Sequence, residues 1–212
     1  MRYIIMCGGR YEFWEKPRQL TLIKGEPIVA RTIRLLREQG ITDIAISSQH
    51  PAFRDFGVPV LQHDNNWVVP QPGISTGDWA DCFYPTYEPT CYLMGDVVFS
   101  SEAIKTIVTT ETEDIEFFAS APPFAENYSK PYAEPFAFKV QDPDHLRRAQ
   151  KICHEARLNG AFLREPIAWE FWSVVKGTPY NFIDFSSYTA INDYTCDIDE
   201  PGDVIRIERS MG

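Results

Sequence analysis

Apolar residues in the first part of the chain follow the pattern of a strand, an amphipathic helix and a second strand. Residues 3–7 form a short apolar run that ends in glycine, which predicts a buried strand. Over residues 28–36, apolar side chains recur at helical spacing with arginines between them. Pro27 suits the first turn of this helix, and Gly40 suits its end. Because residues 41–47 are again apolar, the order predicts the start of a parallel α/β sheet.

The rest of the chain continues this alternation of short buried runs and amphipathic stretches. We expect a loop over residues 8–24, and a loop with a short helix near 77–83 within the region 65–89, which is rich in glycine, proline and aromatic residues. No repeat, low-complexity run or linker interrupts the chain, so one domain over residues 1–212 is expected. The further predicted elements are strands at 58–61, 91–94, 114–121, 134–140 and 181–185, helices at 144–158 and 166–176, and a turn at 195–203.

The charge of the chain limits its partners. The formal net charge of −10 argues against nucleic acid and against an acidic membrane. Residues 1–40 nevertheless contain eight Lys/Arg and four Asp/Glu, whereas the remainder contains twelve basic and twenty-six acidic residues. This basic segment predicts a small anionic ligand bound near the N-terminus, with carboxylates elsewhere for a metal ion. For Arg31, Arg34 and Arg37 we prefer the alternative of a solvated helix face.

The cysteines are odd in number and widely scattered, and no two of them form a C-x-x-C pair. They therefore predict neither a zinc site nor a disulfide framework, and we expect a reducing cytoplasm as the compartment. No stretch approaches the roughly 18 consecutive apolar residues of a membrane span, and the apolar N-terminal run is too short for a signal peptide. The five cysteines are Cys7, Cys82, Cys91, Cys153 and Cys196.

Two segments near the N-terminus suit an anionic ligand. Ligands of open α/β sheets bind at the carboxyl ends of strands, and Gly8 and Gly9 there let backbone N–H groups approach phosphate oxygens. A tight turn is the alternative. Farther along, Lys16 and Arg18 flank Pro17, and an arginine can contact two phosphate oxygens at once. Surface charge in contact with water is the alternative for these two cations.

Carboxylates mark two later segments. Asp96 lies at the tip of the apolar run 91–94, where a charge is costly unless it meets a cation or a helix N-terminus; a turn or cap residue is the alternative. Asp197 and Asp199 are two residues apart, so on an extended segment they point the same way and can bind one hard cation. The alternative is an acidic turn that caps a final helix, a role that Asp203 fits.

These four segments, taken in order, resemble the nucleotidyltransferase family that includes sugar-phosphate, choline-phosphate and acylneuraminate cytidylyl- and uridylyltransferases. The resemblance spans the chain and is strongest over residues 3–48 and 91–99. The resemblance implies an α/β fold, a Rossmann-like three-layer sandwich with a mixed, mainly parallel sheet of the glycosyltransferase-A-like type. The matching stretches are the glycine loop at 6–9, a Pro-Lys-x-Leu-like step at 17–20, a Gly-x-Pro helix start at 25–28, a Gly-Asp strand end at 95–96, an acidic turn at 197–201, and a Gly-x-Ser stretch at 73–76.

The resemblance also implies a reaction. A nucleotidyl group would pass from a nucleoside triphosphate, CTP first and UTP next, to a small phosphorylated acceptor such as a sugar phosphate, and pyrophosphate would be released. Mg²⁺ is the implied cofactor, held by Asp96 and Asp199, with Asp197 as a secondary ligand. Arg18 and Lys16 would neutralise charge at the α-phosphate. The implied nucleotide-binding residues are Cys7, Gly8, Gly9, Arg10, Gly73, Ser75 and Thr76.

Some features depart from the family or leave choices open. Arg18 stands where relatives have lysine, and Lys16 lies two residues earlier, so either cation can be the one that faces the α-phosphate. We expect acceptor-binding elements within about residues 120–180, where Glu134 can accept hydrogen bonds from the acceptor; a solvated carboxylate at a strand start is the alternative. The aromatic residues near Trp169 fit the core or the subunit interface of a homo-oligomer. A metal-dependent glycosyltransferase and a non-catalytic nucleotide-binding protein are the competing functions.

Overall fold

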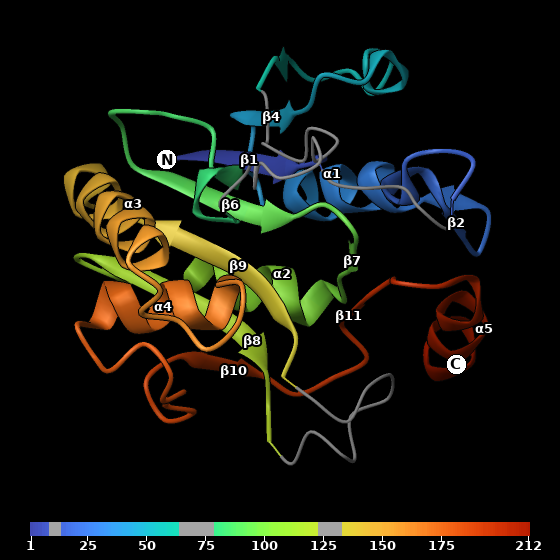
Figure 1. The fold of residues 1–212 in the computed structure, drawn as a ribbon. Coiled ribbons are helices and arrows are strands. Elements are labelled where there is room, and N and C mark those ends of the chain that lie inside the picture. The colour runs from blue at the N-terminus through green and yellow to red at the C-terminus, as the bar shows by residue number, and fades with distance from the viewer. Residues whose placement is uncertain (9–13, 64–78, 123–132) are drawn as a thin grey trace.

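The computed structural model describes residues 1–8, 14–63, 79–122 and 133–212. Within these residues the main sheet has seven strands in the order β10-β8-β9-β6-β1-β4-β5 (Figure 1). Of these seven, β9 alone runs antiparallel to its neighbours, so the sheet is mixed and mainly parallel. The strands are β1 (Arg2–Met6), β4 (Ile44–Ser47), β5 (Val60–Leu61), β6 (Thr90–Met94), β8 (Ile115–Ser120), β9 (Pro135–Val140) and β10 (Thr189–Ile191).

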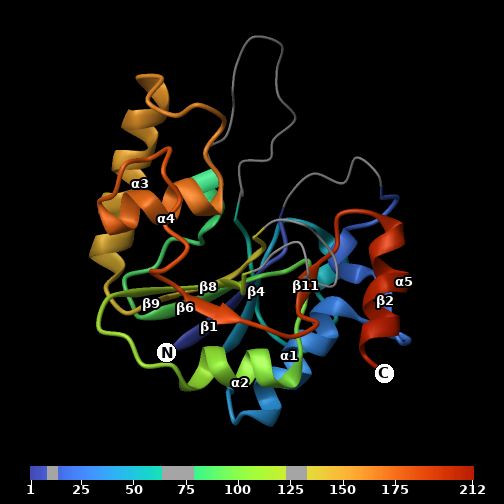
Figure 2. The same cartoon turned by 90° about the horizontal axis from the view of Figure 1, so that it is seen from below.

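Helices cover both faces of this sheet, as Figure 2 shows. Helices α1 (Ile28–Glu38) and α2 (Ser101–Thr109) lie on one face, and α3 (Pro143–Leu158) and α4 (Ala168–Lys176) lie on the other. Successive side chains of β1 point to opposite faces of the sheet. Tyr3 and Ile5 pack in the apolar cluster with α1 and α2. Ile4 and Met6 pack in the cluster with α3 and α4. The structure is therefore the three-layer α/β sandwich that the resemblance implied.

Helix boundaries follow the expected local chemistry. Gly40 follows α1 with a φ of +78°, a conformation that glycine adopts without a Cβ penalty. Asp142 begins α3, and its carboxylate accepts hydrogen bonds from the N–H groups of Asp144 and His145 at 2.8 and 3.1 Å. The described residues contain no helix that is long and apolar enough to cross a membrane.

A smaller apolar cluster lies beside the main sheet at the C-terminal end of the chain. The hairpin of β2 (Leu22–Ile23) and β3 (Glu26–Pro27) packs there against helix α5 (Pro201–Ser210) (Figure 1). Strand β7 (Val97–Val98) pairs antiparallel with β11 (Cys196–Asp197) in the same region. Short 3-10 helices complete the described structure: η1 (Arg18–Leu20), η2 (Pro51–Phe53) and η3 (Trp79–Cys82).

Several element predictions were wrong in detail. Residues 181–185 form turns rather than a strand, because Asn181 bonds the backbone at Leu163 and Ala161, and Phe185 packs against Trp169. The strand in this part of the chain is β10, which begins at Thr189 and pairs with β8. Helix α2 was not predicted, and the predicted loop 8–24 contains η1 and β2.

Candidate functional site

The carboxyl ends of β1 and β6 meet at one edge of the sheet, and Gly95 allows them to touch. Its N–H donates a 3.0 Å hydrogen bond to the carbonyl oxygen of Met6. A Cβ on Gly95 would lie 2.3 Å from that oxygen and 2.9 Å from the sulfur of Cys7, so a larger residue does not fit without movement. This contact brings Asp96 beside the start of the predicted glycine loop.

Cys7 and Gly8 are held at the end of β1. The N–H of Cys7 donates to the carbonyl of Ser47 at 2.9 Å, and its own carbonyl accepts from the hydroxyl of Ser48 at 2.9 Å. The Cys7 side chain is fully buried, and burial first and the charge of Asp96 second raise the pKa of its thiol far above the ordinary value. Cys7 is therefore a neutral packing group in this structure, and its backbone N–H and carbonyl are both already bonded, to Ser47 and Ser48.

Backbone pairing brings the acidic turn to Asp96. Cys196 lies opposite Val98 and Asp197 opposite Val97, and the N–H of Ile198 donates to the carbonyl of Asp96 at 3.0 Å. The side chain of Ile198 is buried in the small C-terminal cluster.

Arg18 lies between the carboxylates of these two segments. Its guanidinium forms ion pairs with Asp96 and, at 2.8 Å, with Asp199, and it also donates to the carbonyl of Ile198 at 3.2 Å. Burial lowers the pKa of Arg18, but the charges of Asp96, Asp199 and Asp197 outweigh it and raise that pKa above its ordinary value. Arg18, Asp96 and Asp199 therefore form one connected charge group, with Asp197 close enough to act on it electrostatically.

The other predicted site residues are placed differently. Lys16 is exposed, and the described residues give it no hydrogen bond or ion pair. Gly9, Arg10, Gly73, Ser75 and Thr76 lie outside the described residues. The structure therefore separates the two N-terminal cations: Arg18 is part of the charge group and Lys16 is not.

Two residues at the site were not singled out by the sequence. Gln19 is buried, and its amide nitrogen donates to the carbonyl of Gly8 at 3.2 Å. The indole N–H of Trp14 donates to the carbonyl of Asp199 at 3.1 Å. Gln19 lies within the Pro-Lys-x-Leu-like step, so its position was a usable signal, whereas nothing in the local sequence marks Trp14.

Asp203 caps helix α5. One of its carboxylate oxygens accepts from the N–H groups of Asp199 and Glu200, at 2.8 and 2.9 Å, and the other pairs with Arg206. The alternative role that the sequence offered for Asp203, a helix cap, is the one observed.

Glu134 lies at the same edge of the sheet, just before β9. Its N–H and carbonyl both bond Ser120 at the end of β8, at 2.8 and 2.9 Å. The preceding residue, Ala133, accepts a 3.0 Å hydrogen bond from the indole of Trp169. Because Glu134 is buried, the alternative of a solvated strand-start carboxylate is wrong. Trp169 itself belongs to the core between the sheet and α4.

The charge group suits a divalent cation. The guanidinium of Arg18 is a positive group on which Asp96 and Asp199 already converge, so it stands in for a cation at that point. Carboxylate oxygens are the hard ligands that Mg²⁺ prefers, and Mg²⁺ is usually bound by one or two carboxylates together with water and substrate phosphates. No group of three or more potential metal ligands converges within the described residues.

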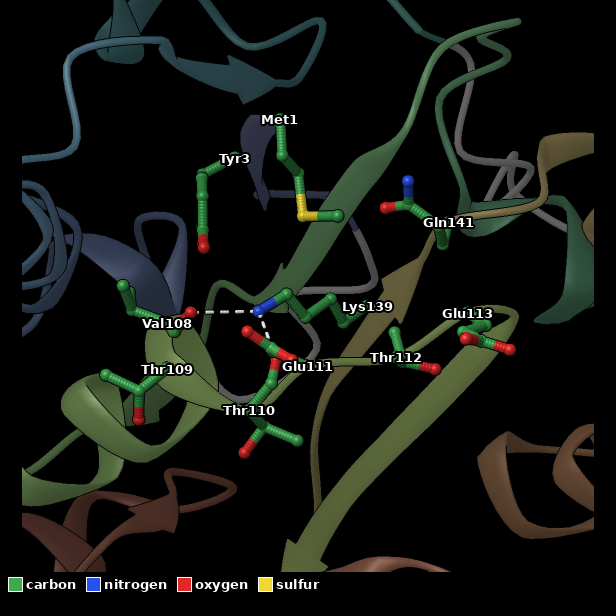
Figure 3. Close-up of a pocket in the computed structure, with 10 residues that line it drawn as sticks. All are labelled: Met1, Tyr3, Val108, Thr109, Thr110, Glu111, Thr112, Glu113, Lys139 and Gln141. Atoms are coloured by element: carbon green, nitrogen blue, oxygen red, sulfur yellow. Dashed lines mark hydrogen bonds between the residues drawn. The ribbon is translucent and has the colours of Figure 1, made fainter.

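A cavity of about 710 Å³ lies at the opposite edge of the sheet, between the start of β1 and the loop after α2 (Figure 3). Lys139 is buried in its wall, but the ammonium group donates to the carbonyls of Ile107, Val108 and Thr110 at 3.0, 2.9 and 2.6 Å. These bonds use its three donors, so Lys139 terminates α2 rather than offering a charge to a ligand.

Three solved structures share this fold at low sequence identity. The CTP:phosphocholine cytidylyltransferase LicC of Streptococcus pneumoniae aligns over 100% of this chain and 99% of its own, with 15% identity and a TM-score of 0.55. A putative glucose-1-phosphate thymidylyltransferase of Bacillus anthracis aligns over 98% and 94%, with 17% identity and a TM-score of 0.57. HddC of Yersinia pseudotuberculosis, solved with GMP-PN, aligns over 99% and 98%, with 12% identity and a TM-score of 0.53. At such identities the likeness establishes the fold alone.

A family model provides the stronger comparison. No curated protein sequence matches this chain significantly. The model of the MobA-like NTP transferase domain, however, matches residues 3–161, which is well over half of the chain and includes most of β1 together with Arg18, Asp96 and Glu134. The chain therefore belongs to the MobA-like NTP transferase domain family and is a nucleotidyltransferase by family.

Proposed function

We propose that this chain transfers a nucleotidyl group from a nucleoside triphosphate to a small phosphorylated acceptor, such as a sugar phosphate, and releases pyrophosphate. CTP is the favoured donor and UTP the next, and the reaction depends on Mg²⁺. The observation that carries the proposal is the charge group of Arg18, Asp96 and Asp199 at the carboxyl edge of the sheet, beside the backbone of Cys7 and Gly8. In this position it combines carboxylates for a metal ion with an arginine for phosphate.

In the proposed reaction, an oxygen of the acceptor phosphate attacks the α-phosphorus. A new O–P bond forms, the bond from the α-phosphorus to the bridging oxygen breaks, and pyrophosphate leaves with the electron pair. The acceptor oxygen is already ionised near neutral pH, so no general base is required. Catalysis then depends on positioning and on stabilisation of charge in the transition state.

The residues of the charge group divide this work. Asp96 and Asp199, with Asp197 nearby, would hold Mg²⁺, which supplies neutralisation of charge on the phosphate oxygens. Arg18 would turn its guanidinium from the carboxylates to the α-phosphate and the leaving pyrophosphate. Gln19 would keep the carbonyl of Gly8 directed away from the phosphates, because its amide already binds that oxygen. Lys16, exposed two residues before Arg18, can join the phosphates once a triphosphate is present.

The acceptor would bind at the neighbouring strand ends. Glu134 lies just before β9, the strand next to β6, and both of its backbone polar groups are bonded to Ser120. A buried carboxylate on a backbone fixed in this way suits a hydroxyl or amine of the acceptor, because a charge-assisted hydrogen bond would offset the hydration that the acceptor group loses on binding. We therefore keep the acceptor-binding elements within about residues 120–180.

The test is a screen for pyrophosphate release. The purified chain is incubated with Mg²⁺ and each of CTP, UTP, GTP, ATP and dTTP against a panel of phosphorylated sugars and amino alcohols. Asp96→Asn should abolish the signal. Asp43→Asn is the matched control, because the Asp43 side chain forms an exposed ion pair with Arg2 near the start of β1, at the opposite edge of the sheet from Asp96.

Each competing function has its own outcome in this screen. Release of a nucleoside diphosphate from a nucleotide-sugar, with no pyrophosphate from any triphosphate, would indicate a glycosyltransferase. Saturable nucleotide binding without turnover on any acceptor would indicate a nucleotide-binding protein without catalysis. Either result would overturn the proposed reaction.

A further inference from the structure

The backbone of Asp199 is held from both sides by side chains that no step of the proposed reaction uses. Asp203 accepts the N–H of Asp199 at 2.8 Å, and the indole of Trp14 donates to its carbonyl at 3.1 Å. The two anchors come from opposite ends of the chain, one in helix α5 and one just before η1. The peptide groups on both sides of Asp199 are therefore fixed, while its side chain reaches toward Arg18.

Asp203 is better placed for this task than an ordinary helix cap. It has no exposed surface, and the same oxygen that binds Asp199 also accepts the N–H of Glu200 at 2.9 Å. Its second oxygen pairs with Arg206, one turn farther along α5. Because both carboxylate oxygens of Asp203 are hydrogen-bonded, the carboxylate cannot rotate without losing a bond. Asp203 therefore fixes the acidic turn at Asp199 and Glu200 relative to helix α5.

Trp14 connects the same point to the apolar cluster under α5. Its ring packs against the cluster formed by Ile23, Ile28, Val98, Cys196, Ile198 and Ile207. The indole nitrogen can only donate a hydrogen bond, so its bond to Asp199 requires the carbonyl oxygen of Asp199 to face the ring of Trp14. A change in this bond would tilt the peptide that carries the Asp199 side chain.

We infer that Asp203 and Trp14 are positioning residues that hold the Asp199 carboxylate at the distance from Asp96 that a divalent cation requires. This inference rests on the proposed function, which gives Asp96 and Asp199 to the metal ion. Side chains that orient a ligating group govern metal affinity although they never touch the metal. Asp203 therefore sets the affinity for the cation, and its effect on helix stability is separate.

The chain offers a matched control for the capping role. Asp142 also accepts two backbone N–H groups at a helix start, those of Asp144 and His145. It follows the carboxyl end of β9, the antiparallel strand, and so lies at the edge of the sheet opposite Asp96. Asp142 is the N-cap of α3, whereas Asp203 lies in the first turn of α5 and bonds back to the N-cap residue Glu200. Asp142→Ala therefore also removes a carboxylate that accepts two backbone N–H groups at a helix start, but it leaves the charge group untouched.

The experiment is a Mn²⁺ titration followed by electron paramagnetic resonance, with and without CTP, on the full chain and four variants. Asp203→Ala and Trp14→Phe should weaken Mn²⁺ binding, by about 10- to 100-fold for Asp203→Ala. Asp203→Asn should weaken Mn²⁺ binding less than Asp203→Ala does. The amide oxygen can still accept both N–H groups, but the amide nitrogen is a donor and cannot replace the oxygen that pairs with Arg206. Asp142→Ala should lower the melting temperature without changing Mn²⁺ binding.

The outcomes separate this inference from the proposed function. If the wild type binds no Mn²⁺ even with CTP, the metal assignment of the proposed function fails, and this inference fails with it. If the wild type binds Mn²⁺ and Asp203→Ala binds equally well, the inference alone is overturned. Should Asp203→Ala not fold, Trp14→Phe decides the matter, and unchanged Mn²⁺ affinity in that variant contradicts the positioning role.

Discussion

The N–H of Ile198 donates a 3.0 Å hydrogen bond to the carbonyl oxygen of Asp96. This backbone contact continues the pairing of β7 with β11, so main-chain bonds hold the acidic turn beside Asp96. Carboxylates held together in this way repel each other unless a cation lies between them. Arg18 supplies that cation in the structure, and the first two predictions depend on this arrangement.

Arg18→Ala should lower turnover much more than it weakens nucleotide binding. Charge at the α-phosphate is greatest during transfer, so loss of the guanidinium affects the transition state more than the ground state. Loss of one such donor lowers kcat by about 100- to 1000-fold in well-studied enzymes, and we expect a loss in that range. The measurement is kcat and KM for the nucleotide by pyrophosphate release.

Two companion variants check the assignment of Arg18. Arg18→Lys should retain measurable activity, because it keeps a cation and matches the residue that the family usually has at this step. Lys16→Ala should have the smaller effect, since Lys16 is exposed and outside the charge group. A crippling Lys16→Ala beside a mild Arg18→Ala would show that the two roles are reversed.

Asp199→Asn should abolish turnover and leave the fold intact. The amide nearly preserves the shape of the side chain but removes the charge that a cation needs. Because Arg18 already neutralises the carboxylates, we expect no gain in stability without metal; the half-exposed Asp199–Arg18 pair contributes only about 0–1 kcal/mol. Melting temperatures with and without Mg²⁺ plus CTP, alongside initial rates, test this. An unfolded variant, or one with normal rates, would make the turn a purely structural element.

Gly95→Ala should destabilise the chain by about 1–3 kcal/mol, because the new methyl group would overlap the carbonyl of Met6 and the sulfur of Cys7. The displacement would also move Asp96, so turnover should fall together with stability. Gly202→Ala is the control, since a Cβ there meets nothing within 4 Å and helix α5 favours alanine. Urea unfolding of both variants gives the comparison, and equal midpoints would refute the close contact.

Glu134→Gln should raise KM for the acceptor and leave KM for the nucleotide unchanged. The amide keeps the size of the buried side chain but replaces a charged acceptor with a weaker neutral one. Glu116→Gln is a suitable control, because Glu116 accepts a hydrogen bond from Thr189 within the same sheet. Equal acceptor KM values in the wild type and Glu134→Gln would remove Glu134 from the acceptor site.

The main elements of the fold were predictable because each has a strong local signal. Strand β1 is a compact apolar run before glycine, and α1 has a regular apolar stripe that ends at Gly40. Helix α2 carried a signal that was overlooked, namely Ser100 as its cap and the spacing of Ala103, Ile104 and Ile107. The prediction of a strand at 181–185 was wrong because Phe185 packs against Trp169 of α4, which is tertiary information.

The site was less predictable than the fold. The glycine loop, Arg18, Asp96 and the acidic turn could be named from their order along the chain. The arrangement that joins them could not, because β7 and β11 are two residues long and show no periodicity. The bond from Trp14 to Asp199 links distant parts of the sequence and has no local signature.

Arg18 and a divalent metal ion should compete for the carboxylates of Asp96 and Asp199. In the structure the guanidinium occupies the point on which Asp96 and Asp199 converge, so Mg²⁺ must displace it to bind both carboxylates. A triphosphate would make this displacement easier, because it offers Arg18 new oxygens. We therefore expect weak Mn²⁺ binding without nucleotide and tighter binding with CTP.

Arg18→Met removes this competition while keeping a long side chain in the half-buried space. It should bind Mn²⁺ more tightly than the wild type in the absence of nucleotide, and it should lose most of the enhancement by CTP. Without metal it should also be less stable by about 1–3 kcal/mol, because the Asp96 carboxylate loses a charged hydrogen-bond partner. Mn²⁺ should restore that stability, since the ion replaces the lost positive charge. Calorimetric titration with Mn²⁺ and thermal melts in chelator test both parts. If Arg18→Met binds Mn²⁺ no better than the wild type, the guanidinium and the metal ion do not compete for these carboxylates.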